Sequence, residues 1–204
     1  PTAVREAAGD AVAGVVAGRS EGGRRGDITA AAPRLPPEAA RRLELALAET
    51  AADRRWQHLE RLLTGSTRDL PALAAAEALL ASAELQPRAR YLAAVALFDH
   101  GLYERAAPEL EKVLGGDGVP GHEAAFLRGR CAFRRERWQE AIDWYRRALA
   151  LAPGEPRRAE LALHLGRAHE LAGELDAAVT AAQRALREEA SDERRLFLLR
   201  LRLR

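Results

Sequence analysis

Methionine and asparagine are absent from this sequence of 204 residues, and lysine and cysteine each occur once. The single cysteine, Cys131, excludes a disulfide within the chain and leaves too few thiolates for a cysteine-based zinc site. Arginine occupies every basic position except Lys112 and the histidines. This bias indicates a GC-rich genome, so we expect a bacterial protein. Because position 1 is not methionine, we expect that the initiator was removed before Pro1 or that the chain is a processed piece.

Long apolar runs and a dominant charge of one sign are also missing. No run is long enough to span a bilayer, so we expect a soluble protein, with the cytoplasm favoured over the periplasm. The 32 Lys and Arg residues and the 30 Asp and Glu residues give a net charge of +2. Because the two signs are interspersed, no broad positive field is expected to attract a polyanion. Nucleic acid is therefore not the expected partner.

Alanine and leucine supply most of the apolar residues, and aromatic residues form only 5% of the chain. This composition favours an all-α fold. Residues 1–34 are rich in Ala, Gly and Arg but contain few large apolar side chains, so we predict a flexible or partner-ordered arm. In residues 35–86 we predict N-terminal helices with a degenerate repeat, including one helix around Trp56 and one from Leu70 to about Leu85.

One spacing pattern, a turn residue, a bulky apolar residue two positions on and an alanine three positions further, occurs three times. Its members are Gly101, Tyr103 and Ala106, then Glu136, Trp138 and Ala141, and finally Gly173, Leu175 and Ala178. A small residue precedes each alanine by the same interval, namely Ala94, Gly129 and Gly166. Two antiparallel helices of this length cannot bury an apolar face alone, so we predict stacked hairpins in residues 87–120, 122–155 and 159–190.

These hairpins resemble the tetratricopeptide repeat (TPR). The second hairpin matches best, with small residues, an aromatic residue and a closing proline at Gly129, Ala141, Tyr145, Ala148 and Pro153. The third hairpin keeps Leu165, Gly166, Ala178 and Ala185, and the first keeps Ala106 and Leu110. The second hairpin departs from the repeat at Ala125, Arg128 and Ala132, where large or aliphatic residues are usual. The resemblance implies a right-handed α-solenoid of antiparallel helix hairpins, in which Gly129 and Ala141 lie at a close helix crossing.

The resemblance also implies an inner face, lined by the first helix of each hairpin, that binds a peptide or a partner subunit. The lining positions, carried over one at a time, are Tyr91, Val95, Phe98, Phe126, Arg130, Phe133, Arg134, Leu163, Arg167 and Glu170. Aromatic side chains beside arginines suit a ligand with apolar anchors and acidic groups. In the alternative interpretation, Tyr91, Phe126 and Phe133 only fill space between hairpins, and their burial distinguishes the two.

Residues that perform catalysis or hold a metal form no recognisable pattern. The five histidines, His58, His100, His122, His164 and His169, are scattered, and we expect them to be solvated or partly packed. The glycines that follow Leu114 lack the lysine and the Ser or Thr of a phosphate-binding loop. No nucleophile lies beside a candidate base. We therefore predict a non-catalytic protein without a cofactor or a metal.

The last residues, 191–204, begin with a helix cap at Ser191 or Asp192 and then alternate leucine and arginine. Alternation is typical of a strand, but we favour a capping helix or tail. The predicted function is a protein–protein interaction adaptor or scaffold. Two alternatives stay open. One is an accessory subunit of a larger complex, held by the arm and the tail. The other is an RNA-binding helical repeat that uses Arg130, Arg134, Arg146, Arg147 and Arg167.

Overall fold

A computed structural model describes residues 67–81, 85–152 and 154–203, together with Glu38, Arg41, Gln57, Arg61 and Leu63. These residues form eight α-helices and no strand, which confirms the all-α fold class. They belong to two compact units, one that reaches to Glu109 and one that starts at Leu110. The predicted arm in residues 1–34, most residues of the helix predicted around Trp56, including Trp56 itself, and the closing proline at position 153 lie outside the described residues.

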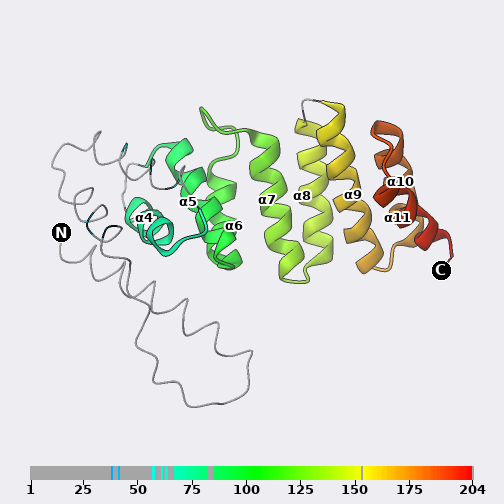
Figure 1. Cartoon of the computed structure of the whole chain (residues 1–204), viewed down its shortest axis with the longest axis horizontal. Coiled ribbons are helices and arrows are strands. Elements are labelled where there is room, and N and C mark those ends of the chain that lie inside the picture. The colour runs from blue at the N-terminus through cyan, green and yellow to red at the C-terminus, as the bar shows by residue number, and fades with distance from the viewer. Residues whose placement is uncertain are drawn as a thin grey trace, which may run out of the picture. The chain divides into compact units, whose positions relative to one another are not determined.

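The first unit contains α4 (Leu70–Leu80), α5 (Pro87–Asp99) and most of α6 (Tyr103–Lys112), as Figure 1 shows. The helix α4 begins after Asp69, whose carboxylate accepts a hydrogen bond of 2.9 Å from the N–H of Ala72. This bond satisfies one of the unpaired donors at the helix start. The prediction that α4 continues to about Leu85 was wrong. Gln86, which precedes Pro87, is extended, as is usual before proline.

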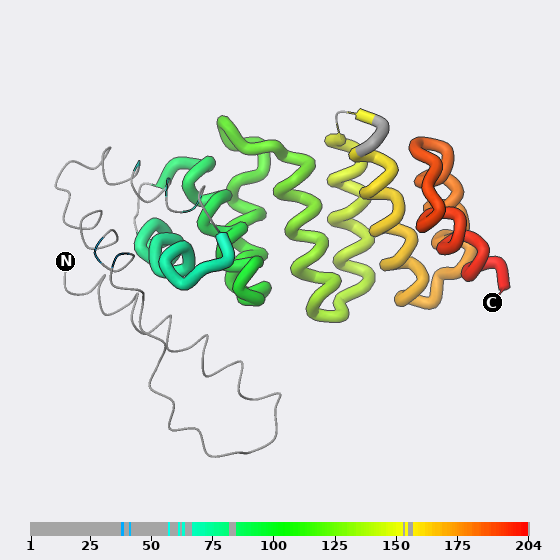
Figure 2. The backbone as a smooth tube through the Cα atoms, viewed as in Figure 1, coloured from blue at the N-terminus to red at the C-terminus, as the bar shows by residue number. Residues whose placement is uncertain are grey.

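The second unit contains five helices: α7 (Gly121–Arg134), α8 (Trp138–Leu151), α9 (Glu155–Leu171), α10 (Leu175–Glu188) and α11 (Asp192–Arg202). In Figure 2 the helices α7 to α10 run alternately up and down, and each packs against the next. Two antiparallel hairpins result, α7 with α8 and α9 with α10. The helix α9 begins before the expected start at Ala159, because Pro156 in its first turn favours helix initiation.

The turn positions of the spacing pattern share one backbone geometry. The φ angles are 80° at Gly101, 58° at Glu136 and 81° at Gly173. In each turn a backbone N–H donates to a carbonyl in the preceding helix: Leu102 to Leu97 at 2.9 Å, Arg137 to Ala132 at 3.0 Å, and Glu174 to His169 at 2.9 Å. This bond and the left-handed residue before it characterise the Schellman motif. The sequence pattern therefore marks the same helix ending in all three hairpins.

Small residues lie where helices approach most closely, as the pattern predicts. Gly129 of α7 faces Tyr145 of α8. At Gly166 of α9, a Cβ atom would lie 3.0 Å from the ring of Phe197 and 3.4 Å from the carbonyl oxygen of Ala178. Ala141 and Ala178, the alanines of the pattern, are fully buried. The small residues therefore leave room for atoms of the neighbouring helix, mostly side-chain atoms, to lie against the helix backbone.

The C-terminal helix α11 resolves the two interpretations of the leucine and arginine alternation. The hydroxyl of Ser191 accepts a hydrogen bond of 3.3 Å from the N–H of Arg194, which confirms the predicted cap. The side chains of Phe197, Leu198 and Leu201 are buried against α9 and α10. Buried positions three and four residues apart follow the helical period. The strand interpretation was therefore wrong for residues 192–202.

Candidate functional site

Phe126 belongs to a buried cluster of the second unit that is formed by side chains of α7, α8, α9 and α10. Its ring is only 5% exposed. The ring centroid lies 5.8 Å from Tyr145 of α8 and 4.9 Å from His164 of α9, the latter in an edge-to-face arrangement. Such aromatic pairs add to the stabilisation from apolar burial. Phe126 therefore packs between three helices, as the space-filling interpretation predicts for this residue.

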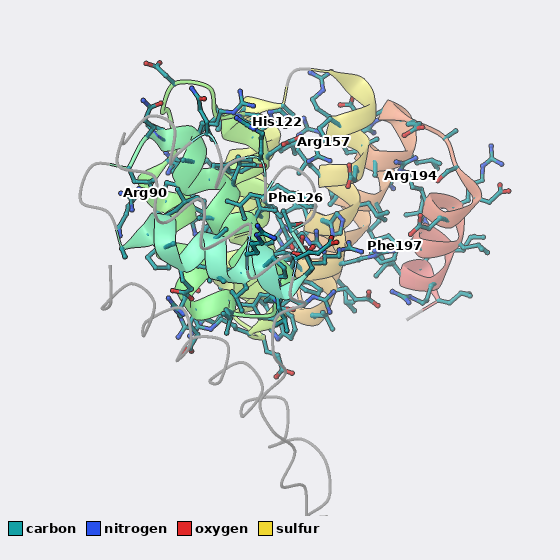
Figure 3. All side chains as sticks on the ribbon, turned by 60° about the vertical axis from the view of Figure 1, so that its left-hand side comes forward. Arg90, His122, Phe126, Arg157, Arg194 and Phe197 are labelled. Carbon is teal, nitrogen blue, oxygen red and sulfur yellow. The ribbon has the colours of Figure 1, made fainter. Side chains whose placement is uncertain are left out.

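Two arginines lie over the ring of Phe126. The guanidinium carbon of Arg130, on α7, is 5.6 Å from the ring centroid, and that of Arg157, on α9, is 5.1 Å from it. Phe126 and Arg157 lie close together in Figure 3. Arg157 also forms ion pairs with Glu160 at 2.6 Å and with Glu123 at 3.8 Å. A layer of cationic groups therefore covers the aromatic cluster on the first-helix side.

Phe133 and Arg134 lie at the C-terminal end of α7. The ring of Phe133 is half-buried, with its centroid 5.1 Å from Trp138 and 6.5 Å from Tyr145. Arg134 is exposed. Arg130 and Arg134 are one helical turn apart, so they share a side of α7 with Phe133 between them in sequence. This end of α7 presents an aromatic edge beside positive charge.

The predicted lining residues of the third hairpin all contact α11. Leu163 is 5% exposed and packs in a cluster with Phe197 and Leu198. Arg167 donates to the carboxylate of Glu193 at 2.6 Å, and Arg200 donates to the carboxylate of Glu170 at 2.6 Å. The helix α11 therefore covers this part of α9, much as α9 covers Phe126. Partner binding by these three residues stays a prediction.

The remaining lining residues belong to α5 in the first unit. Tyr91 and Val95 are half-buried. Phe98 is 6% exposed, and its ring centroid lies 5.3 Å from that of Tyr103 at the start of α6. Phe98 is thus a packing residue of its hairpin. Since the two units are separate bodies, we consider the α5 residues apart from those of α7 and α9.

The sequence prediction missed a buried ion network around Arg128. This side chain is 8% exposed in the position where the repeat usually has an aliphatic residue. Its guanidinium donates to Glu111 at 2.5 Å and to Glu140, and it lies 5.1 Å from the ring centroid of Trp144. Burial opposes the charge, but the hydrogen bonds to Glu140 and Glu111 outweigh it and raise the pKa of Arg128. The network thus joins three segments by charge instead of apolar packing.

The cysteine and two of the histidines among the described residues are buried. Burial raises the pKa of the Cys131 thiol to about 12, so the thiol stays protonated and unreactive at neutral pH. His100 and His169 are buried and hydrogen-bonded, to the carbonyl of Asp69 at 2.9 Å and to Glu174 at 2.6 Å, which corrects our expectation of solvated or partly packed histidines. Within the described residues, no three His, Cys, Asp or Glu side chains form a potential metal site. No helix among them is long and apolar enough to cross a membrane.

Comparison with known families gives one assignment. The sequence model described as tetratricopeptide repeat matches at three places, residues 72–118, 100–156 and 154–193. Together these matches span residues 72–193, which is more than half of the chain. No curated protein matches the sequence.

Several solved structures share the fold at low sequence identity. YrrB is 16% identical, with a TM-score of 0.62, and the match covers 82% of this chain and 84% of YrrB. The N-terminal domain of stress-induced protein-1 from C. elegans is 17% identical, with a TM-score of 0.53, and the match covers 57% of this chain and 94% of that domain. MamA from Desulfovibrio magneticus RS-1 is 17% identical, with a TM-score of 0.52, and the match covers 83% of this chain and 86% of the MamA chain. Their likeness extends to the arrangement of helices.

Proposed function

The chain belongs to the tetratricopeptide repeat family, and from this membership we propose a non-catalytic adaptor that binds a protein or peptide on the first helices of its hairpins. The observation that carries the proposal is the arrangement on α7. The half-buried ring of Phe133 lies in sequence between Arg130 and Arg134, which are one turn apart on one side of the helix. Aromatic and arginine side chains are the residues most often responsible for binding energy in protein interfaces.

The proposed binding surface, which we call the α7–α9 face, consists of Arg130, Phe133, Arg134, Arg157 and Arg167. Phe126 and Leu163 support it from inside, since both are buried. Arginine binds carboxylates through paired hydrogen bonds, and a half-buried aromatic ring receives an apolar side chain. The ligand class that fits is therefore a peptide segment with an apolar anchor and acidic residues on both sides of it. YrrB, one of the structural neighbours, is a TPR protein with a peptide-binding site, which supports this type of function.

The RNA-binding alternative is weaker. Of the five arginines that it requires, Arg146 lies 3.9 Å from the carboxylate of Asp143, which lowers the potential that a phosphate backbone would experience there. Arg147 stacks on Trp144 at 5.3 Å. The net charge of +2 also provides no broad positive field for a polyanion. RNA binding would also show a steep dependence on salt, which provides a direct check.

The proposal is tested with a displayed library of random peptides selected on the purified protein. We expect the selected peptides to share an apolar position flanked by Asp or Glu. The variant Arg130→Glu with Arg134→Glu reverses two charges on the α7–α9 face. We expect this variant to lose at least tenfold in affinity for a selected peptide, measured by fluorescence anisotropy with the peptide as the probe.

The matched control reverses two charges on the second helices, by Arg146→Glu in α8 and Arg187→Glu in α10. The control also replaces two arginines by two glutamates, so the change in net charge is the same. Both side chains are exposed, so the packed core is untouched. Circular dichroism confirms that each variant is folded. Equal affinity of the two variants for the peptide would place the binding surface elsewhere and refute the proposal.

A further inference from the structure

Two polar groups beside Phe126, which Figure 3 labels, have no hydrogen-bond partner in the part of the chain that the structure describes. The hydroxyl of Tyr145 is one of them, although the side chain is fully buried. The imidazole of His164 is the other, with its ring centroid 5.9 Å from that of Tyr145. An unpaired buried hydroxyl is costly and rare in folded proteins, so a partner from outside the chain would stabilise it.

His164 differs in this respect from the two fully buried histidines. His100 is bonded to the carbonyl of Asp69, and His169 is bonded to Glu174. His164 is partly exposed, so a ligand can contact its imidazole directly. A neutral imidazole carries one N–H donor and one acceptor nitrogen. The aromatic cluster therefore offers a free donor at its edge.

The hydroxyl of Tyr145 lies near two arginines of the α7–α9 face. Burial raises the pKa of Tyr145, and the positive charges of Arg130 and Arg134 act in the opposite direction. Arg134 is exposed and has no hydrogen bond or ion pair with another described residue. Because no partner holds this guanidinium, it can bind a ligand and move as the ligand approaches the hydroxyl.

The electrostatic potential at His164 is positive. Burial lowers the pKa of His164 to about 4, and the charges of three arginines of the α7–α9 face contribute to this effect, namely Arg167, Arg130 and Arg157. Glu160 opposes them. Three positive charges thus act on the imidazole against one negative charge, although Arg157 and Arg167 also form ion pairs. An anionic group beside His164 would be attracted.

A carboxylate fits these groups best. The hydroxyl of Tyr145, one nitrogen of the His164 imidazole and the guanidinium of Arg134 can each donate a hydrogen bond. A carboxylate accepts several such bonds through its two oxygens, and hydrogen bonds to a charged group are the stronger ones. A neutral amide of the same shape would gain nothing from the positive potential.

We propose that Tyr145, His164 and Arg134 form a subsite that receives one side-chain carboxylate of the peptide ligand, with the Tyr145 hydroxyl as a donor to it. The inference rests on the proposed function and adds residues that determine specificity. The arginines of the α7–α9 face attract acidic peptides in general. The hydroxyl and the imidazole distinguish a carboxylate at one position of the peptide from the corresponding amide.

The variant Tyr145→Phe removes only the hydroxyl. Its affinity for a selected acidic peptide, measured by fluorescence anisotropy, should be about tenfold lower, as expected for a hydrogen bond to a charged group. Peptides in which each acidic residue in turn is replaced by its amide then identify the bound carboxylate. Against the peptide that lacks this carboxylate, Tyr145→Phe and the unaltered chain should bind equally. The variant His164→Leu should show the same pattern.

The matched control is Tyr103→Phe, which removes a hydroxyl from a half-buried tyrosine of the first unit. We expect this variant to bind the peptide as the unaltered chain does. Since the Tyr145 hydroxyl has no partner within the described residues, Tyr145→Phe should be at least as stable as the unaltered chain in urea. A loss of affinity then cannot result from unfolding.

Three outcomes would overturn the inference. The first is an unchanged affinity of Tyr145→Phe for the acidic peptide. The second is an equal loss of affinity for the acidic peptide and for all of its amide forms. The third is a marked loss of stability in Tyr145→Phe, which would mean that the hydroxyl already has a partner in the chain. In each case the proposed function still stands if reversing the charges of Arg130 and Arg134 weakens binding, whereas a failure to select any peptide refutes both.

Discussion

Gly129 of α7 faces the ring of Tyr145 of α8 so closely that a Cβ atom at position 129 would lie 2.7 Å from the ring carbons Cδ1 and Cε1. Tyr145 is fully buried, and its ring packs against Phe126 and Phe133. These contacts restrict the movement of the ring. The contact between α7 and α8 depends on a glycine at this position.

Replacement of Gly129 by alanine should lower the free energy of unfolding, because overpacking a core costs about 1 to 3 kcal/mol. The higher helix propensity of alanine offsets about 1 kcal/mol of this cost, so we expect a net loss of up to about 2 kcal/mol. Urea unfolding monitored by tryptophan fluorescence measures the difference. The control is Gly121→Ala on the same helix, where the new Cβ meets Leu151 at an ordinary 3.7 Å. We expect Gly121→Ala to be neutral or stabilising, and a similar loss in both variants would contradict the prediction.

Glu136 has a left-handed conformation, with φ at 58°, in the turn where the other two hairpins have glycine. A side chain in this conformation costs about 1 kcal/mol, so Glu136→Gly should raise the free energy of unfolding by up to about 1 kcal/mol. The reciprocal change, Gly173→Ala, should lower it by about 1 kcal/mol. A Cβ at Gly173 meets no atom within 4 Å, so its effect comes from the backbone alone. Thermal unfolding of both variants checks the prediction. The unfolding temperature should rise for Glu136→Gly and fall for Gly173→Ala, and a change of the same sign in both would contradict it.

The turns and helix crossings could be predicted from the sequence because each is determined by a few neighbouring residues. A left-handed residue is needed where a helix ends in a Schellman motif, so Gly101 and Gly173 mark those ends directly. Likewise, Gly129 and Gly166 are small because another helix lies against them. These features repeat at a fixed interval, which makes the hairpins recognisable even where single positions differ.

The roles of individual lining residues could not be predicted in the same way. The repeat pattern assigns Phe126 and Leu163 to the inner face, but how much of each ring or side chain remains exposed depends on the next hairpin and on α11. Arg167 and Glu170 have partners on α11, a helix far along the chain. Side-chain pairing across hairpins depends on the packed structure, and the pattern within one hairpin contains no information about it.

Arg128 provides a test of charge against packing. Its partners Glu111 and Glu140 have side chains that are 45% and 30% exposed, so both carboxylates can turn towards water when the guanidinium is removed. Arg128→Leu, which restores the residue type usual in the family, should therefore change the free energy of unfolding by less than about 1 kcal/mol. Arg128→Ala should lower it by about 2 to 3 kcal/mol, because it also leaves a cavity beside Trp144.

Urea unfolding of the two Arg128 variants at neutral pH distinguishes the contributions. A large and equal loss in both would show that the ion pairs, and not the buried side-chain volume, stabilise this part of α7. In that case Glu140→Gln should cause a comparable loss, since it removes one of the two hydrogen-bonded carboxylate charges.

His164 should make the second unit sensitive to acid. Burial against Phe126 and Tyr145 lowers the pKa of His164 to about 4, and the charge of nearby Arg167 acts in the same direction. Arg130 and Arg157 add to this effect, while Glu160 opposes it. The folded state thus prefers the neutral imidazole, whose pKa in an unfolded chain is about 6.5. The contribution of the neutral His164 to the free energy of unfolding is therefore complete above pH 6.5. As the pH falls from about 6.5 towards 4, this contribution is lost, by up to about 3 kcal/mol.

Carboxylates also titrate in acid, so the contribution of His164 is measured as a difference between two proteins. The free energy of unfolding of the unaltered chain and of His164→Leu is determined in urea at pH 7 and at about pH 4.5. The unaltered chain should lose about 2 kcal/mol more than the variant between the two, because only the unaltered chain must keep a neutral imidazole in the aromatic cluster. Equal losses in the two proteins would mean that the charged imidazole is tolerated in the folded state, against the burial of His164 between Phe126 and Tyr145.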